Sequence, residues 1–366
     1  MTWQQEIVRN LEAHIDAGDM TAASVLVGKG DEDLFEWVGG RVSWSPGSRA
    51  VKPDDVFLIA SITKPMVTSA VATLVAEGKL GLRDRISDYV PEFAGGGKEV
   101  ITLEHCFTHT SGLTDMVPGD VELRKRNASL SDYVKAACGS QLLFTPGSDV
   151  RYQSSGILML AAVAEKVSGK SLRELVTERV FKPAGMSSTD LCWRPAYEGR
   201  RVDARVVHGA GSENWNHNSP YWKNLGAPWG GAHSTAADIA RLLRTVLDGG
   251  VAPGGRRVFT AHCNRMLVTD RIPSMPGLSD AARQAHGWGL GWVIRKSGGA
   301  WSYNSPAGAF GHSGATGTVA WADPRTRVIF VLLTNIADGP DVRGKCGEIV
   351  ARALCARYIT IPPSIT

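Results

Sequence analysis

The sequence has no run of lysine and arginine residues. Its 40 basic and 36 acidic side chains leave a formal net charge of +4 at pH 7, and both signs are spread along the 366 residues. Proteins that bind nucleic acid or anionic membranes through charge concentrate their basic residues in a patch or tract. The charge pattern therefore argues against a nucleic-acid or membrane partner.

Long hydrophobic runs are also missing. The stretch "MVTSAVATLVAEG" (66–78) is interrupted by Thr and Ser, and it is shorter than the ~20 residues that a membrane span needs. The N-terminal stretch 1–20 lacks the basic region, the apolar region and the cleavage site of a secretory signal. We therefore expect a protein that stays in the cytoplasm.

Patterns typical of metal and nucleotide sites are absent. The six cysteines form no C-x-x-C pair and no H-E-x-x-H occurs, so we expect reduced, mostly packed thiols, no metal site and no cofactor. The glycine-rich run 287–292 lacks G-x-G-x-x-G spacing and does not open a helix. We predict a close-packed strand there.

The G-x-S-x-G nucleophile elbow is missing as well. The nearest stretch is "GHSGA" (311–315), which has Ala where the second Gly is required. An esterase of the α/β-hydrolase type is therefore disfavoured.

Strand patterns concentrate at the two ends of the chain. Apolar runs flank a turn in 22–40 and again in 317–335, which predicts two hairpins, and 342–358 has helical spacing. The middle is mainly helical, with the clearest helical patterns at 65–80, 131–138, 155–168, 171–180 and 235–248. We therefore expect both ends to build one antiparallel sheet.

One short stretch, Ser61-Ile62-Thr63-Lys64, has the spacing of a nucleophile and its base. Residues three apart on a helix share a face, and Pro65 is tolerated in a first turn but not deeper, so a helix should begin near Ser61. Burial against the apolar run that follows would lower the pKa of Lys64 toward that of a base. Because S-x-x-K also occurs by chance, the catalytic interpretation depends on partner residues.

Two segments supply candidate partners. Tyr152-Gln153-Ser154 comes directly before a predicted helix, where surrounding structure can hold a phenol. His312-Ser313-Gly314 leads into an apolar strand, and the glycines around it allow another group to approach the backbone closely.

With these segments the sequence resembles the serine β-lactamase and penicillin-binding-protein-like superfamily, and it is most similar to the class C β-lactamase and family VIII carboxylesterase branch. The resemblance runs over roughly 20–335 and includes "FLIASITKPM", "ITLEHCFTHTSGL", "RYQSSGILMLAAVAEKVSG" and "GGAHSTAADIARLL". It implies an α/β (α+β) fold of the β-lactamase/transpeptidase type, with an antiparallel sheet flanked by helices and a mainly helical inserted domain. We predict a sheet domain from 1–62 and 285–366, a helical domain from 63–284, and an active site at their interface.

The resemblance also implies roles for individual residues. Ser61 would attack the substrate carbonyl and become acylated, Lys64 would take or relay its proton, and Tyr152 would act with the lysine in proton transfer to the leaving group and in activating the deacylating water. His312-Ser313-Gly314 matches the Lys-Thr-Gly strand motif of the family. Ala315 falls where a main-chain N–H joins that of Ser61 in the oxyanion hole.

Two positions depart from the family pattern. The tyrosine motif usually ends in Asn and here ends in Ser154, a shorter group with different reach. The Lys of the third motif, which helps β-lactamases to recognise a substrate carboxylate, is His312 and is expected to be largely uncharged near neutral pH. Both changes weaken the β-lactam interpretation and leave acyl transfer intact, and similar histidine and tryptophan substitutions occur in the esterase-like relatives.

Other aromatic and histidine residues have more than one interpretation. Trp222 and Trp229, on the irregular stretch 208–233, line an acyl pocket or belong to the core. His109 is a candidate general base, but the resemblance places it in a structural turn. Residues 208–233 and 270–287 have the length and composition of pocket walls, lids or disordered segments, and the aromatic residues of the first stretch argue against disorder there.

Three functions stay open at this level. The first is a serine hydrolase acting as a carboxylesterase on small esters. The second is a D-amino-acid-specific amidase or peptidase, or a weak β-lactamase. The third is a non-catalytic binding protein of the same superfamily. The first two imply a small-molecule ester or amide as the substrate, and the sequence does not indicate an oligomeric state.

Overall fold

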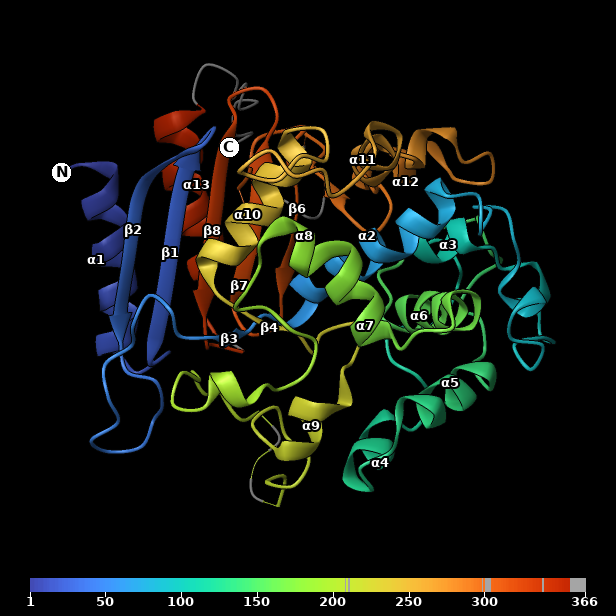
Figure 1. Cartoon of the computed structure of the whole chain (residues 1–366), viewed down its shortest axis with the longest axis horizontal. Coiled ribbons are helices and arrows are strands. Elements are labelled where there is room, and N and C mark those ends of the chain that lie inside the picture. The colour runs from blue at the N-terminus through green and yellow to red at the C-terminus, as the bar shows by residue number, and fades with distance from the viewer. Residues whose placement is uncertain (208, 210, 298, 300–303, 338, 356–366) are drawn as a thin grey trace.

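A six-stranded antiparallel sheet joins the two ends of the chain (Figure 1). The computed structural model describes residues 1–207, 209, 211–297, 299, 304–337 and 339–355. The strand order is β2-β1-β8-β7-β6-β5, from strands β1 (Ala22–Lys29), β2 (Glu32–Gly40), β5 (Val293–Ile294), β6 (Phe310–Gly314), β7 (Thr318–Asp323) and β8 (Val328–Thr334). Both predicted hairpins are confirmed, and the pairing of β1 with β8 connects them.

Helices cover both faces of this sheet. Figure 1 shows α1 (Trp3–Asp16) and α13 (Val342–Leu354) on one side and α10 (Ala236–Leu247) on the other. The seven residues of β8, "VIFVLLT", are all buried because alternate side chains enter two different cores. Phe330 lies in the core under α1 and α13, and Val331 lies in the larger core that continues into the helical part of the molecule.

The helical part is built around α2 (Thr63–Ala76), which packs against α6 (Ser155–Ser168). The other helices are α3 (Leu103–Phe107), α4 (Asp120–Lys125), α5 (Leu130–Cys138), α7 (Leu172–Val176) with a π-helical turn (Thr177–Phe181) leading to α8 (Lys182–Ala184), α9 (Pro220–Leu225), α11 (Ala261–Val268) and α12 (Asp280–Ala285). A two-stranded sheet pairs β3 (Phe57–Leu58) with β4 (His233–Ser234) just before α2. The predicted middle helices are confirmed.

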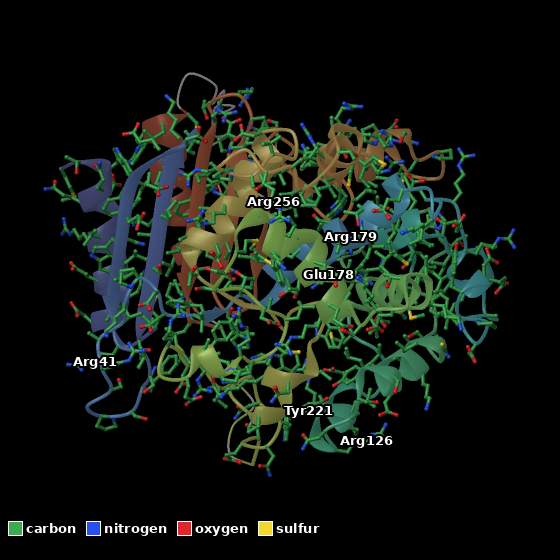
Figure 2. The ribbon with its side chains drawn as sticks, viewed as in Figure 1. Arg41, Arg126, Glu178, Arg179, Tyr221 and Arg256 are labelled. Carbon is green, nitrogen blue, oxygen red and sulfur yellow. The ribbon has the colours of Figure 1, made fainter. Side chains whose placement is uncertain are left out.

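The irregular stretch 208–233 contains a short helix that the sequence did not reveal. Ser219 caps α9 by accepting the Trp222 N–H at 3.1 Å, and Pro220 takes the first helical position. Tyr221 of α9 lies close to the α4–α5 segment that carries Arg126 (Figure 2), and its hydroxyl donates to the Ala128 carbonyl at 2.9 Å. The stretch 270–287 likewise contains α12. Residues 208 and 210 lie outside the described residues.

The strand predicted for 287–292 is wrong. Residues 289–291 are bends, and Trp288 forms only an isolated antiparallel bridge with Val293 of β5. Trp288 and Trp292 are buried, and a side chain at Gly289 would place its Cβ 1.9 Å from the Leu267 carbonyl oxygen. The apolar alternation therefore reflects close packing of a bent segment.

The predicted domain limits stay a prediction. The helix α10 lies in the range assigned to the helical domain, yet Arg244 on it donates to the carbonyls of Gly30 and Glu32 in the N-terminal hairpin. Within the described residues, no helix combines the length and hydropathy needed to cross a membrane, and no three His, Cys, Asp or Glu side chains gather as a metal-binding group.

Candidate active site

Ser61 and Lys64 are in contact at the start of α2. Ser61 lies in a 3₁₀ turn (Ala60–Ile62) that runs directly into the helix. The Lys64 side-chain nitrogen is 2.9 Å from the Ser61 hydroxyl oxygen. Ala60 has a φ of 45°, a left-handed conformation that is costly for a residue with a side chain, and the Thr63 hydroxyl donates to the Ala60 carbonyl at 2.6 Å. The three-residue spacing therefore produces the expected pair.

Lys64 is a buried amine with a shifted pKa. Its exposed fraction is 1%, and burial lowers its pKa to about 7, while the charge of Asp115 acts in the opposite direction. The same nitrogen donates to the main-chain carbonyl of Trp229 at 2.8 Å. In the neutral form, one N–H directed at that carbonyl leaves the lone pair free to accept the Ser61 proton. The geometry thus suits a general base near neutral pH.

The aromatic ring of Tyr152 lies near the Lys64 amine. The lysine nitrogen is 4.7 Å from the centroid of the tyrosine ring. His109 packs against this ring with 4.9 Å between centroids, and it accepts the Gln153 N–H on Nδ1 at 3.1 Å. Lys64 therefore lies beside both Ser61 and Tyr152, and the catalytic roles predicted for these three residues stay a prediction.

His109 lies in a turn, as expected. Its φ is 60° and its side chain is fully buried, with Trp288 packed on it at 4.1 Å between ring centroids. Burial holds the pKa of His109 well below its ordinary value, and the charge of Lys64 acts in the same direction. The neutral ring is placed to support Tyr152.

The end of β6 is tied to the segment before Ser61. The hydroxyls of Thr316 and Thr318 donate to the carbonyls of Leu58 and Ile59 at 2.7 and 2.9 Å. A Cβ added at Gly314 would lie only 2.4 Å from the Ile59 carbonyl oxygen, so this close approach requires glycine. These contacts bring Ala315, which is exposed, beside the nucleophile turn.

Two main-chain donors are available at this junction. Within the described ranges, no main-chain carbonyl accepts the N–H of Ser61 or that of Ala315. An oxyanion hole needs such a pair of unengaged donors.

His312 is buried and neutral. It is 4% exposed, and burial together with the charge of Lys64 lowers its pKa to about 3. Its Nδ1 is 2.6 Å from the Ser313 carbonyl oxygen, and because a carbonyl only accepts, Nδ1 carries the proton. The ring centroid is 5.9 Å from that of Tyr152. The third motif therefore presents an uncharged imidazole near neutral pH.

Ser154 is held by a carboxylate that no sequence pattern indicates, that of Asp115. Its N–H and its hydroxyl both donate to Asp115 Oδ1, at 2.8 and 2.7 Å. The Asp115 carbonyl also accepts the Ser155 N–H at 2.8 Å, so Asp115 fixes the start of α6. Because Asp115 precedes Ser154 by 39 positions, no local spacing indicates this contact.

Trp222 and Trp229 are both packed in the larger core. Their exposed fractions are 2% and 5%, and their ring centroids are 6.4 Å apart. The Arg124 guanidinium lies 4.6 Å from the centroid of Trp222. Trp229 accepts a hydrogen bond from Lys64 through its main-chain carbonyl. A pocket-lining role for either ring stays a prediction.

Comparison with known proteins places this chain in a family. The family model described as Beta-lactamase matches residues 7–354. The chain is 30% identical over 345 residues to Penicillin-binding protein 4 of Amycolatopsis lactamdurans, an alignment that covers 91% of this chain and 84% of that protein. It is 26% identical to Esterase EstB of Burkholderia gladioli, with 87% and 86% covered.

A solved structure gives the same fold. The crystal structure of a family VIII carboxylesterase superimposes with a TM-score of 0.73 at 22% identity, and the match covers 97% of this chain and 98% of that one. The family match extends over nearly the whole chain, and among the relatives are both esterases and penicillin-binding proteins. The chain therefore belongs to the beta-lactamase family and is a serine hydrolase.

Proposed function

We propose that this protein is a carboxylesterase that hydrolyses small, uncharged esters through an acyl-enzyme on Ser61. The observation that carries the proposal is the 2.9 Å contact between the Ser61 hydroxyl and the buried amine of Lys64. A buried amine with a pKa of about 7 is able to accept a proton from a serine hydroxyl near neutral pH.

The first half of the reaction forms the acyl-enzyme. Neutral Lys64 takes the Ser61 proton as the Ser61 oxygen bonds to the ester carbonyl carbon. The resulting oxyanion accepts hydrogen bonds from the N–H groups of Ser61 and Ala315. When the C–O bond to the alcohol breaks, the leaving oxygen receives a proton from the Lys64–Tyr152 pair.

The second half releases the acid. A water molecule gives its proton to the same pair and attacks the acyl carbon. The tetrahedral intermediate then collapses, the bond to Ser61 breaks, and Ser61 regains a proton. Because the protons of Lys64 and Tyr152 are coupled, the pair acts as one acid–base unit.

The preference for uncharged esters rests on two departures from the family pattern. The neutral His312 offers no positive charge where β-lactamases use a lysine to recognise a carboxylate. Ser154 is engaged by Asp115 and is shorter than the usual asparagine. The similarity to Esterase EstB supports the ester assignment.

A second candidate is an amidase or peptidase acting on D-amino-acid substrates. The similarity to Penicillin-binding protein 4 favours it. Turnover of D-alanyl amides or of a chromogenic cephalosporin at rates that rival esters would support this candidate.

Intact-mass spectrometry tests the proposal. Wild type, Ser61→Ala and the control Ser45→Ala, whose residue lies in an exposed loop, are mixed briefly with an activated short-chain ester. An added acyl mass on wild type and the control, but not on Ser61→Ala, is the expected result. An adduct on Ser61→Ala would identify another nucleophile. Absence of adducts and of ester turnover in all three would favour the amide-specific or the non-catalytic alternative.

A further inference from the structure

A guanidinium from the last helix reaches the peptide group that follows Gly314. Arg343, the second residue of α13, directs its Nη1 at the Gly314 carbonyl oxygen over 2.8 Å. Asp341 caps the same helix end by accepting the Gly344 N–H at 2.9 Å. This cap fixes the start of α13 and with it the backbone position of Arg343. The contact joins residues 29 positions apart and is partly buried.

This carbonyl and the N–H of Ala315 belong to one peptide unit. Resonance within the unit couples them, so a positive donor on the oxygen draws electron density from nitrogen and makes the N–H a stronger donor. An arginine stays charged at all relevant pH values, and a hydrogen bond from a charged group is about twice as strong as a neutral one. The Gly317 N–H also donates to the Gly314 carbonyl, at 3.1 Å.

The strand end around Gly314 is also closely packed. A Cβ at Gly314 would lie 2.3 Å from the Thr318 hydroxyl oxygen and 3.1 Å from the Ala60 Cβ, so only glycine fits at this strand end. Of the two hydrogen bonds that the Gly314 carbonyl accepts from Gly317 and Arg343, the one from Arg343 has a charged donor.

We propose that Arg343 is a positioning residue that orients and polarises the Gly314–Ala315 peptide, and so strengthens the Ala315 N–H as an oxyanion donor. This rests on the proposed function, because the donor matters only if an oxyanion forms beside Ser61. Arg343 acts through the peptide and needs no contact with an uncharged substrate.

The test compares Arg343→Met with the control Arg352→Met. Arg352 lies on the same helix and donates to Glu6, so the control removes an equal charge from a different site. Hydrolysis is measured with an uncharged p-nitrophenyl ester and with its thionoester, in which sulfur replaces the carbonyl oxygen. Sulfur is a weak hydrogen-bond acceptor, so the ratio of the two kcat/KM values reports on the strength of the oxyanion donors.

Removing a whole oxyanion-hole donor lowers kcat by a factor of about 10²–10³. Weakening one donor should therefore lower kcat for the oxygen ester by about tenfold. We expect that loss in Arg343→Met with KM unchanged, together with a smaller ester-to-thionoester ratio, while Arg352→Met keeps the wild-type values. Arg343→Gln, which also removes the charge, replaces the Met variant if the latter does not fold.

Two results would overturn the inference. An unchanged ester-to-thionoester ratio in the neutral variant, with any loss of rate explained by a lower melting temperature, would limit Arg343 to a structural role. Failure of wild type to hydrolyse either ester would remove the proposed function and this inference with it. The behaviour of wild type therefore separates the two failures.

Discussion

The Ser154 hydroxyl donates a hydrogen bond to the Asp115 carboxylate, with 2.7 Å between the two oxygens. The same carboxylate oxygen accepts the Ser154 N–H, so Asp115 is fixed at the start of α6. From this position its negative charge raises the pKa of Lys64, while burial lowers it by more. Asp115 thus sets part of the acid–base balance of the site.

Replacing Asp115 by Asn tests this electrostatic role. Loss of the negative charge is expected to lower the pKa of Lys64, so the neutral amine would persist to lower pH. The acidic limb of the kcat/KM profile should then move to lower pH. Asp132→Asn, which removes a charge from the cap of α5, is the control and should leave the limb in place. An Asp115→Asn profile identical to wild type would show that this charge does not act on the base.

The parts of the site that could be predicted from sequence are those set by short spacing. Ser61 and Lys64 meet because residues three apart share a helical face, and Pro65 marks where that helix begins. The two hairpins follow from apolar runs that flank polar turns.

What the sequence did not reveal depends on contacts between distant segments. The Trp229 carbonyl that orients Lys64 is 165 positions away in the sequence. Because it is a main-chain group, the sequence of side chains does not indicate this contact. The helix α9 has a Ser219-Pro220 start signal but is too short to show periodicity. In the run 287–292, alternating apolar residues imitate a strand although tertiary packing bends the chain.

The shifted pKa of Lys64 predicts the pH dependence of the wild-type enzyme. If the neutral amine is the base, kcat/KM for an uncharged ester should rise with pH and level off above about 7, where Lys64 loses its proton. Below that pH the rate should fall about tenfold per pH unit, because the fraction of neutral amine falls by that factor. Initial rates from pH 5 to 9 provide the measurement, and a rate independent of pH over this range would contradict the assignment of Lys64.

The variant Tyr152→Phe separates the role of the Tyr152 hydroxyl from that of its ring. The ring contacts with His109 and Lys64 remain possible, so the fold should be retained while the hydroxyl is lost. A general acid or base typically raises the reaction rate about 10²–10⁴-fold, so we expect kcat to fall by a factor within that range. Tyr221→Phe, which removes a hydroxyl that bonds to Ala128, is the matched control and should keep the wild-type kcat. Near-normal turnover by Tyr152→Phe would assign the proton transfers to Lys64 alone.

The lowered pKa of His233 predicts how the stability of the protein depends on pH. Its side chain is 2% exposed on β4, and burial, with smaller effects from Lys223 and Arg201, lowers its pKa to about 3. The same residue in the unfolded chain has a pKa of about 6.5, so between these values the unfolded state binds a proton that the native state does not. The free energy of unfolding should therefore fall as the pH drops from about 6.5 toward 3, because protonation stabilises only the unfolded chain.

The contribution of this one group is isolated by His233→Gln. One proton bound only by the unfolded state gives a slope of up to about 1.4 kcal/mol per pH unit, so this variant should lose that much of the wild-type slope. Urea unfolding at several pH values between 4 and 6 measures the slope. His262→Gln, on the exposed surface of α11, should keep the wild-type slope. If the slopes of His233→Gln and wild type are equal, His233 is protonated in the native state at these pH values, and its burial does not exclude the charge.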